Sequence, residues 1–157
     1  MAEVKRIDHV AIAVRDCDAA TQRYADLLRA KHIRTEILQE KAGPVKVSYV
    51  QLGENVISLI QSIAADGFLN KHIEQHGEGL HHLGIEVDDL DGFVAEIKAK
   101  GFRIPLSDEF SNRKEVVLSP RDSNGVILQI LEWKAGSDKT VEDRIQRVLS
   151  LENIPKK

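Results

Sequence analysis

The sequence predicts an α+β domain in which two tandem βαβββ modules form one curved eight-stranded sheet with a cleft. Three observations predict it: a repeat at an offset of 73 residues, a change from strand to helical spacing in each copy, and three further short strand-like segments after each helix. With 157 residues, 42% of them hydrophobic, the chain can bury a core without disulfides or structural metal. Any bound metal is therefore expected to be functional.

The repeat is clearest in two strand-like segments, residues 9–14 and 82–87. After each segment the apolar residues follow helical spacing. Aspartates at 16 or 18, and at 89 or 91, suit helix N-caps because a short carboxylate accepts hydrogen bonds from first-turn amides. The identical pairs at this offset are His9/His82, Ile12/Ile85, Val14/Val87, Asp16/Asp89 and Asp18/Asp91.

The other strands are expected at 33–38, 45–52 and 56–61 in the first module, and at 102–106, 114–119 and 126–131 in the second. The modules cover 5–62 and 79–133, and the linker 63–78 is expected to contain a short helix at 68–76. The main domain thus spans 1–135. Residues 136–157 are expected to form a C-terminal helical extension, because their apolar residues share one helical stripe.

Composition and charge exclude several classes of protein. The 22 basic and 25 acidic residues are interspersed and form no basic stripe, so nucleic acid is not an expected partner. No apolar run approaches the roughly 20 residues of a membrane span. A single cysteine, Cys17, and an N-terminus without an apolar signal segment predict a cytoplasmic or organelle-matrix setting.

Two histidines occupy equivalent strand positions in the repeat. Side chains alternate along a strand, so Ile12 and Val14 pack on one face of the first segment while His9 lies on the other among small residues. His82 is placed in the same way in the second copy. A pseudo-twofold axis between the modules can therefore bring both imidazole rings to one point.

Each module also ends in an apolar strand with one polar residue, Ser58 in the first and Gln129 in the second. They lie 71 residues apart, close to the repeat offset. A buried polar side chain without a partner costs roughly 1–3 kcal/mol. Each residue can satisfy this need either by bonding a neighbouring strand or by facing a ligand, and the sequence leaves both readings open.

Three runs carry a resemblance to a known family: residues 7–14, residues 77–88 with their Gly-Leu-His-His sequence, and residues 118–130. They resemble the vicinal oxygen chelate superfamily of glyoxalases, bleomycin resistance proteins and dioxygenases, and within it the methylmalonyl-CoA epimerases. The likeness covers residues 5–133. It implies a divalent metal (Zn, Co, Ni, Mn or Fe) that chelates two substrate oxygens and stabilises an enolate-like intermediate, with His9, His82 and Gln129 as metal ligands.

The chain departs from this family pattern at two positions. Ser58 stands where the family usually has Glu or Gln, and Gln129 stands where it usually has a metal-binding Glu. Two imidazoles and one amide carry no negative charge, so we expect weaker metal binding. Amides also cannot transfer protons. The candidate bases are Glu40, before the third strand, and Glu86, on the cleft face beside His82; the alternatives are a solvated turn charge for Glu40 and a rim charge paired with lysine for Glu86.

Several other residues have weaker claims to function. Arg113 and Lys114 align with family lysines and are candidates, with Ser58, for contacting an acidic substrate such as a CoA phosphate. His81 is expected to point away from His82 by strand alternation and to be structural. His72 and His76 have zinc-binding spacing on a helix, although a surface pair is the simpler reading.

The predicted function is a metal-dependent, epimerase- or isomerase-like enzyme acting on a small acyl-CoA or other oxygen-chelating carbonyl compound. Two enzyme alternatives are a glyoxalase-type lyase and an iron-dependent dioxygenase. A third alternative is a non-catalytic small-molecule binding protein that uses the same cleft without metal. A homodimer is expected, with neither nucleic acid nor membrane as partner.

Overall fold

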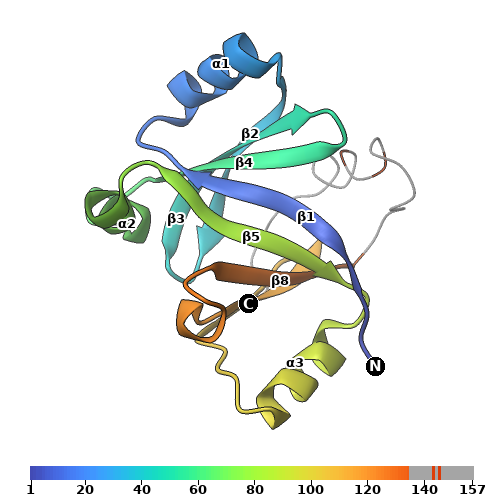
Figure 1. Cartoon of the computed structure of the whole chain (residues 1–157). Helices are drawn as coiled ribbons and strands as arrows, with labels where there is room; N and C mark the ends of the chain where they lie inside the picture. The colour runs from blue at the N-terminus through green and yellow to red at the C-terminus, as the bar shows by residue number, and fades with distance from the viewer. Residues whose placement is uncertain (135–142, 144, 146–157) are drawn as a thin grey trace.

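The computed structural model describes residues 1–134, 143 and 145. Eight strands form one curved sheet in the order β2-β3-β4-β1-β5-β8-β7-β6, flanked by helices (Figure 1). The elements are β1 (Val4–Ala13), α1 (Cys17–Leu28), β2 (Lys31–Glu40), β3 (Gly43–Leu52), β4 (Asn55–Ser62), α2 (Phe68–His76), β5 (Gly79–Val87), α3 (Leu90–Ala99), β6 (Leu106–Glu109), β7 (Arg113–Leu118), a short 3₁₀ turn (Pro120–Asp122) and β8 (Ile127–Trp133).

The two modules meet at the centre of the sheet, where β1 and β5 pair antiparallel. Within each module the first strand pairs in parallel with the last, β1 with β4 and β5 with β8. The strand order is therefore the same outward from the β1–β5 junction in both directions. This arrangement confirms the predicted α+β fold of tandem βαβββ modules.

The helices α1 and α3 cover the outer face of the sheet at its two ends (Figure 1). Ile12 and Val14 pack with α1, and Ile85 and Val87 pack with α3, as the alternation of side chains predicts. On the other face, small residues of β1 pack against Leu69 and other residues of α2. The branched side chains of β1 and β5 are thus buried beneath helices. The opposite face of these strands, which carries the histidines, faces the cleft.

The predicted helix caps are present at equivalent positions. The Asp16 side chain accepts hydrogen bonds from first-turn amides of α1, and Asp89 accepts one from the Gly92 amide in α3. The first aspartate of each pair is therefore the cap. Each bonded carboxylate satisfies amides that the helix itself leaves unpaired.

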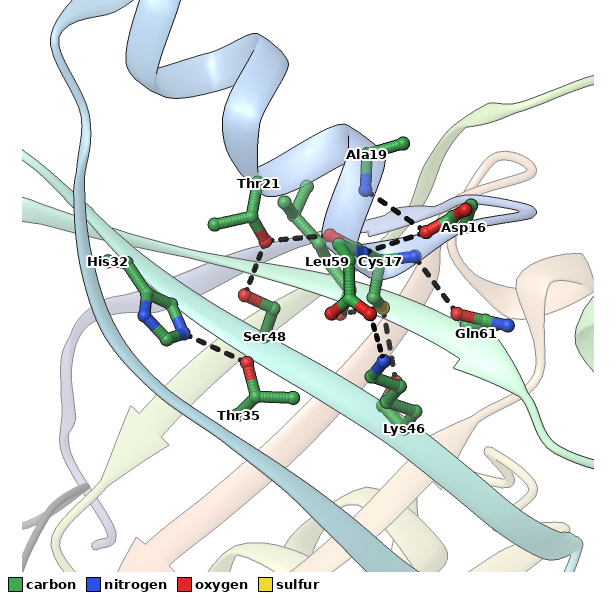
Figure 2. Close-up of polar contacts among 11 residues, drawn as sticks. Asp16, Cys17, Ala19, Thr21, His32, Thr35, Lys46, Ser48, Leu59 and Gln61 are labelled. Carbon is green, nitrogen blue, oxygen red and sulfur yellow. Dashed lines mark hydrogen bonds and ion pairs between the residues drawn. The ribbon is translucent and has the colours of Figure 1, made fainter.

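Cys17 begins α1 and is completely buried against β3 and β4 (Figure 2). Its Sγ donates to the carbonyls of Leu59 (3.2 Å) and Lys46 (3.5 Å), and its amide donates to Gln61 Oε1 (2.9 Å). Burial raises the pKa of the Cys17 thiol to about 11. The thiol is therefore protonated at neutral pH and serves packing.

One strand lies elsewhere than predicted. The expected strand at 102–106 is instead β6, at 106–109, and residues 102–105 have no regular structure. Pro105 explains the shift, because proline has no amide hydrogen to donate to a neighbouring strand. The linker helix has the predicted bounds. Apart from residues 143 and 145, the predicted C-terminal helix lies outside the described residues.

The β1–β5 ladder contains three register shifts, and two of them, β-bulges next to the histidines, shape the cleft. Between the pairs Ile7–Ile85 and His9–Gly84, β1 has one extra residue, Asp8. Between the pairs Ala11–His82 and Ile12–Leu80, β5 has one extra residue, His81. Bulges of this kind re-aim side chains. No helix in the described part of the chain is both long and apolar enough to span a membrane.

Candidate metal and substrate site

The two repeat-related histidines face each other across the β1–β5 junction. The distance between His9 Nε2 and His82 Nε2 is 3.2 Å, and the rings are nearly perpendicular at 83°. Gly84 provides the space for this arrangement, since a Cβ at that position would lie 2.3 Å from His9 Cε1. The predicted convergence of two imidazoles is therefore present in the structure.

The remaining ring nitrogen of each histidine contacts the residue before it. His9 Nδ1 lies 2.8 Å from Asp8 Oδ2, and His82 Nδ1 lies 2.8 Å from His81 Nδ1. Trp133 Nε1 donates to the other oxygen of Asp8 at 3.0 Å. When both Nδ1 atoms carry the proton, two Nε2 lone pairs face each other. Such a pair is stable only with a cation or a proton between the two nitrogens.

The pKa of His82 lies well below its usual value, because the ring is buried and because His9 and His81 are close. Burial and the neighbouring His72 lower the pKa of His81 to about 4. The rings of His81 and His82 are therefore neutral at physiological pH. A neutral imidazole is the form that binds a metal ion.

The histidines lie in a pocket with about 660 Å³ of empty space, including its opening to solvent. This is within the range of small-molecule sites. The wall combines aliphatic side chains with a few polar groups. The lining residues are Asp8, His9, Leu38, Glu40, Val47, Tyr49, Val56, Ser58, Ile60, His82, Arg113, Gln129, Leu131 and Trp133.

The donor set in this pocket fits a divalent metal ion. Two nitrogens bound to one zinc ion at about 2.1 Å each lie at most about 4.2 Å apart, and the observed 3.2 Å meets this limit. Gln129 Oε1 is buried and has no hydrogen-bond partner among the described residues. The described residues contain no cluster of three or more His, Cys, Asp or Glu ligands. A metal here would therefore bind His9, His82 and the amide oxygen of Gln129.

Glu40, at the end of β2, lines the same pocket. Burial and then the nearby Glu115 carboxylate raise its pKa from 4.5 to about 8, although Arg113 acts in the opposite direction. Glu40 is therefore mostly protonated at neutral pH and ionises slightly above it. A carboxyl group with such a pKa can donate or accept a proton under physiological conditions.

Arg113 is buried in the pocket wall, where its guanidinium lies over the ring of Phe110 at 4.4 Å. Its Nε donates to Glu115 Oε2 at 2.6 Å. The sequence predicts that Arg113 meets an acidic substrate, and in the structure Arg113 lines the same pocket as the two histidines. Ser58 is also buried in this wall.

Two other predicted site residues lie elsewhere. Glu86 is only 1% exposed, forms ion pairs with Lys5 (3.5 Å) and Arg6 (3.6 Å), and is absent from the pocket wall. Lys114 lies on the other face of β7 and pairs with Asp91 at 2.8 Å and Glu132 at 3.2 Å. Both residues thus have charged partners away from the histidines.

Three pocket residues with polar groups were not predicted from the sequence: Asp8, Tyr49 and Trp133. Tyr49 donates to Glu36 Oε1 at 2.9 Å, and burial raises its pKa well above 10, so it remains neutral. The signal for Asp8 was available, since it precedes His9 as His81 precedes His82. The expected separation of His81 from His82 is wrong, because the bulge brings their Nδ1 atoms together.

Comparisons with known proteins agree with this architecture. Residues 8–114 match the model of the glyoxalase/bleomycin resistance protein/dioxygenase superfamily. The mitochondrial methylmalonyl-CoA epimerase of Mus musculus is 34% identical over 133 residues, covering 80% of this chain and 71% of the relative. The ethylmalonyl-CoA/methylmalonyl-CoA epimerase of Cereibacter sphaeroides is 29% identical over 135 residues, covering 81% of this chain and 97% of the relative.

A solved structure extends the likeness to the whole fold. A variant of the Streptomyces coelicolor methylmalonyl-CoA epimerase, in complex with 2-nitronate-propionyl-CoA, superimposes with a TM-score of 0.77 at 25% identity. The match covers 85% of this chain and 100% of that protein. With its repeated modules and paired histidines, the chain belongs to the glyoxalase/bleomycin resistance protein/dioxygenase superfamily.

Proposed function

We propose that this protein is a metal-dependent enzyme that moves a proton on a small acyl-CoA or a similar oxygen-chelating carbonyl compound, as epimerases and isomerases do. The observation that carries the proposal is the 3.2 Å approach of His9 Nε2 and His82 Nε2 in one pocket. The epimerase relatives and the CoA ester bound to the Streptomyces coelicolor enzyme support the substrate class.

In this proposal His9, His82 and Gln129 would hold a divalent cation. A cation held by these three residues would still be able to bind water or two substrate oxygens. A bound divalent cation would act as a Lewis acid and stabilise negative charge on those oxygens when a neighbouring C–H loses its proton. The buried, unbonded Oε1 of Gln129 supports its place in the donor set.

Glu40 supplies the proton transfer. In its ionised form it takes the proton from the carbon next to the substrate carbonyl, and in its protonated form it returns one. Arg113 keeps a positive charge in the same wall, which favours a substrate that carries a carboxylate. Asp8 is engaged by His9 and Trp133, so Glu40 is the better candidate acid and base.

A metal analysis tests the first part of this proposal. Protein purified without added metal should contain about one divalent ion per chain, and His9→Ala and His82→Ala should both lose it. A parent protein without metal that also fails to bind added Zn²⁺, Co²⁺ or Mn²⁺ would overturn the proposal.

Solvent exchange tests the second part. An acyl-CoA such as methylmalonyl-CoA, incubated in deuterated water with the metal-loaded protein, should gain deuterium at the α-carbon, as measured by mass spectrometry. His9→Ala should abolish the exchange. A metal-loaded protein that exchanges no proton on acyl-CoA esters but consumes dioxygen would point to the oxygenase alternative.

A non-catalytic binding protein is the second candidate, and one observation favours it. Ser58 stands where the family usually has Glu or Gln, and Gln129 stands where it usually has a metal-binding Glu. Much of the pocket wall is also aliphatic. In that case the parent should bind small carbonyl compounds without metal. His9→Ala should then retain most of the affinity for the carbonyl compound. In the enzyme proposal, His9→Ala should instead lose the metal and the proton exchange.

We also propose that the protein is a homodimer. Large apolar side chains are exposed on α1 and at the start of β5, including Leu27 (73% exposed) and Leu80 (72% exposed). Exposed apolar patches mark contact surfaces more often than single exposed residues do. Analytical ultracentrifugation should give twice the chain mass, and Leu27→Lys with Leu80→Lys should shift it toward the monomer.

A further inference from the structure

We propose that the two bulge residues, Asp8 and His81, are positioning residues for the metal centre and make its two histidines unequal ligands. The inference rests on the proposed metal-dependent function and adds residues that act through His9 and His82. It assigns the stronger ligand to the first module and the weaker one to the second. The evidence lies in the backbone, in the contacts of Asp8 and in the contacts of His81.

The first observation concerns the backbone: each of the two bulges near the cleft inserts its extra residue directly before a histidine. The extra residue is Asp8 in the β1 bulge and His81 in the β5 bulge. They are separated by the same 73 residues as His9 and His82. In a regular strand, neighbouring side chains point to opposite faces and do not meet. The bulges remove this restriction at the two places where an outer partner for an imidazole is needed.

On the first side, Asp8 is held at both carboxylate oxygens. Oδ2 accepts from His9 Nδ1 at 2.8 Å, and Oδ1 accepts from Trp133 Nε1 at 3.0 Å. This fixes the proton on Nδ1 and leaves Nε2 of His9 free to bind a metal. A carboxylate behind a histidine also makes the ring a stronger donor to the metal.

On the second side, the partner of His82 is another imidazole. His81 Nδ1 lies 2.8 Å from His82 Nδ1, and the His81 ring is 4.7 Å from His72 and 6.0 Å from Phe68 of α2, centroid to centroid. These α2 contacts hold the ring in place. A neutral imidazole orients His82 as Asp8 orients His9, but it adds no negative charge. His82 should therefore be the weaker ligand.

The experiment compares metal affinity rather than turnover. Metal-free parent protein, Asp8→Asn, His81→Phe and the control Asp26→Asn, on the exposed face of α1, are titrated with Co²⁺, and binding is followed by visible absorption. Zn²⁺ affinity is measured in parallel by competition with a chelating dye. Loss of an outer partner typically weakens metal binding by about 10–100-fold, and we expect this for Asp8→Asn.

His81→Phe should weaken Co²⁺ binding by only a few-fold, and Asp26→Asn should leave it unchanged. Thermal unfolding of the metal-free proteins separates lost ligand tuning from lost folding. If Asp8→Asn does not fold, Trp133→Phe provides the second variant, since it removes one hydrogen bond to Asp8 and keeps an aromatic ring. We expect it to weaken Co²⁺ binding a few-fold.

The outcomes distinguish this inference from the function on which it rests. A parent that binds metal while Asp8→Asn and Trp133→Phe bind it equally well would overturn the role of Asp8 and leave the proposed function intact. A larger loss in His81→Phe than in Asp8→Asn would overturn the assigned asymmetry. A parent that binds no divalent ion would overturn both.

Discussion

The two halves of the sheet share a backbone plan but contribute different chemistry to the pocket. The β1–β4 half contributes His9, its carboxylate partner Asp8, and Glu40. The β5–β8 half contributes His82 with its imidazole partner His81, and the second module also supplies the buried Arg113. The acidic groups of the pocket thus come from one module, and a neutral and cationic set comes from the other.

This division indicates which features of a duplicated module are fixed by its backbone. The histidine pair, the two bulges and the two helix caps occur at matching positions in both halves. The residues that set charge and proton transfer do not match. We infer that the repeat provides the position of the proposed metal centre, whereas divergence between the modules provides the groups for the proposed reaction.

The largest expected effect separates the two candidate bases. Glu40→Gln should slow α-proton exchange by about 10²–10⁴-fold, because it removes the only carboxyl group proposed to move the proton. Glu86→Gln should leave exchange nearly unchanged, since Glu86 pairs with Lys5 and Arg6 away from the pocket wall. Mass spectrometry of the deuterated thioester measures both. If Glu86→Gln slows the exchange more than Glu40→Gln does, the base would be Glu86, in the second module.

The raised pKa of Glu40 predicts a pH dependence of stability. The pKa of the Glu40 carboxyl group is about 8 in the folded protein, compared with 4.5 for a glutamate in an unfolded chain. The folded protein therefore holds this proton more tightly than the unfolded chain does. The free energy of unfolding should therefore fall as the pH rises from about 4.5 to 8, by up to about 5 kcal/mol from this group. Urea unfolding at several pH values measures it.

Glu40→Gln is the matched control for that measurement, because it cannot ionise. The difference in stability between parent and variant should change in favour of the variant as the pH rises to 8. A difference that is constant from pH 5 to 9 would show that Glu40 has an ordinary pKa, and would weaken its role as the proton carrier.

Changing Gln129, the third proposed metal donor, tests the difference in charge between the two halves of the pocket. Gln129→Glu restores a negative ligand in the second half and should strengthen Zn²⁺ binding by about 10-fold or more, since a carboxylate binds a divalent ion better than an amide. The metal-free variant should be less stable, because it buries a charge without a partner. Dye competition and thermal unfolding, with and without Zn²⁺, test both expectations. Equal Zn²⁺ affinity in parent and variant would remove Gln129 from the donor set.

The space for the histidine rings also differs between the modules. Gly84→Ala would place a Cβ 2.3 Å from His9 Cε1, so the His9 ring must move away from its position. Overpacking of this kind costs typically about 1–3 kcal/mol, and metal affinity should fall with it. Ala11, paired with His82, already carries a Cβ. Ala11→Gly should cost about 1 kcal/mol and keep metal binding, as urea unfolding and Co²⁺ titration can show.

The sequence was sufficient for the features that depend on local pattern. The repeat offset, the two candidate caps of each helix and the bounds of α2 follow from spacing and side-chain chemistry, and the fold follows from their order. Features that depend on pairing between distant strands could not be predicted from the sequence. The bulge at His81 arises only when β1 and β5 align, and alternation therefore predicted the wrong contact for this residue.

The same limit applies to charged residues of the site. Neighbours in sequence such as Arg113 and Lys114 look alike as surface cations. The structure buries Arg113 in the pocket and leaves Lys114 on the opposite face of β7. Glu86 was expected on the same face of its strand as His82. Its ion-pair partners, Lys5 and Arg6, belong to another strand, β1. For these charged residues, the partner across the sheet could not be predicted from the sequence.

The smallest expected effect concerns a repeat-related pair of surface ion pairs. Lys46 of β3 contacts Asp18 in the first turn of α1 at 2.7 Å, and Lys114 of β7 contacts Asp91 in the first turn of α3 at 2.8 Å. Each lysine thus forms an ion pair between a strand and the helix that covers it. Exposed pairs contribute about 0–1 kcal/mol. Lys46→Met and Lys114→Met should therefore lower stability by similar small amounts, and less so at high salt.

Steady-state kinetics turn these two variants into a test of the substrate site. A structural ion pair should leave the KM for an acyl-CoA unchanged in both variants, because both lysines lie outside the pocket wall. If Lys114 instead meets a CoA phosphate, only Lys114→Met should raise KM. That result would extend the substrate site around the edge of β7 and would make the second module the half that binds the nucleotide end of the substrate.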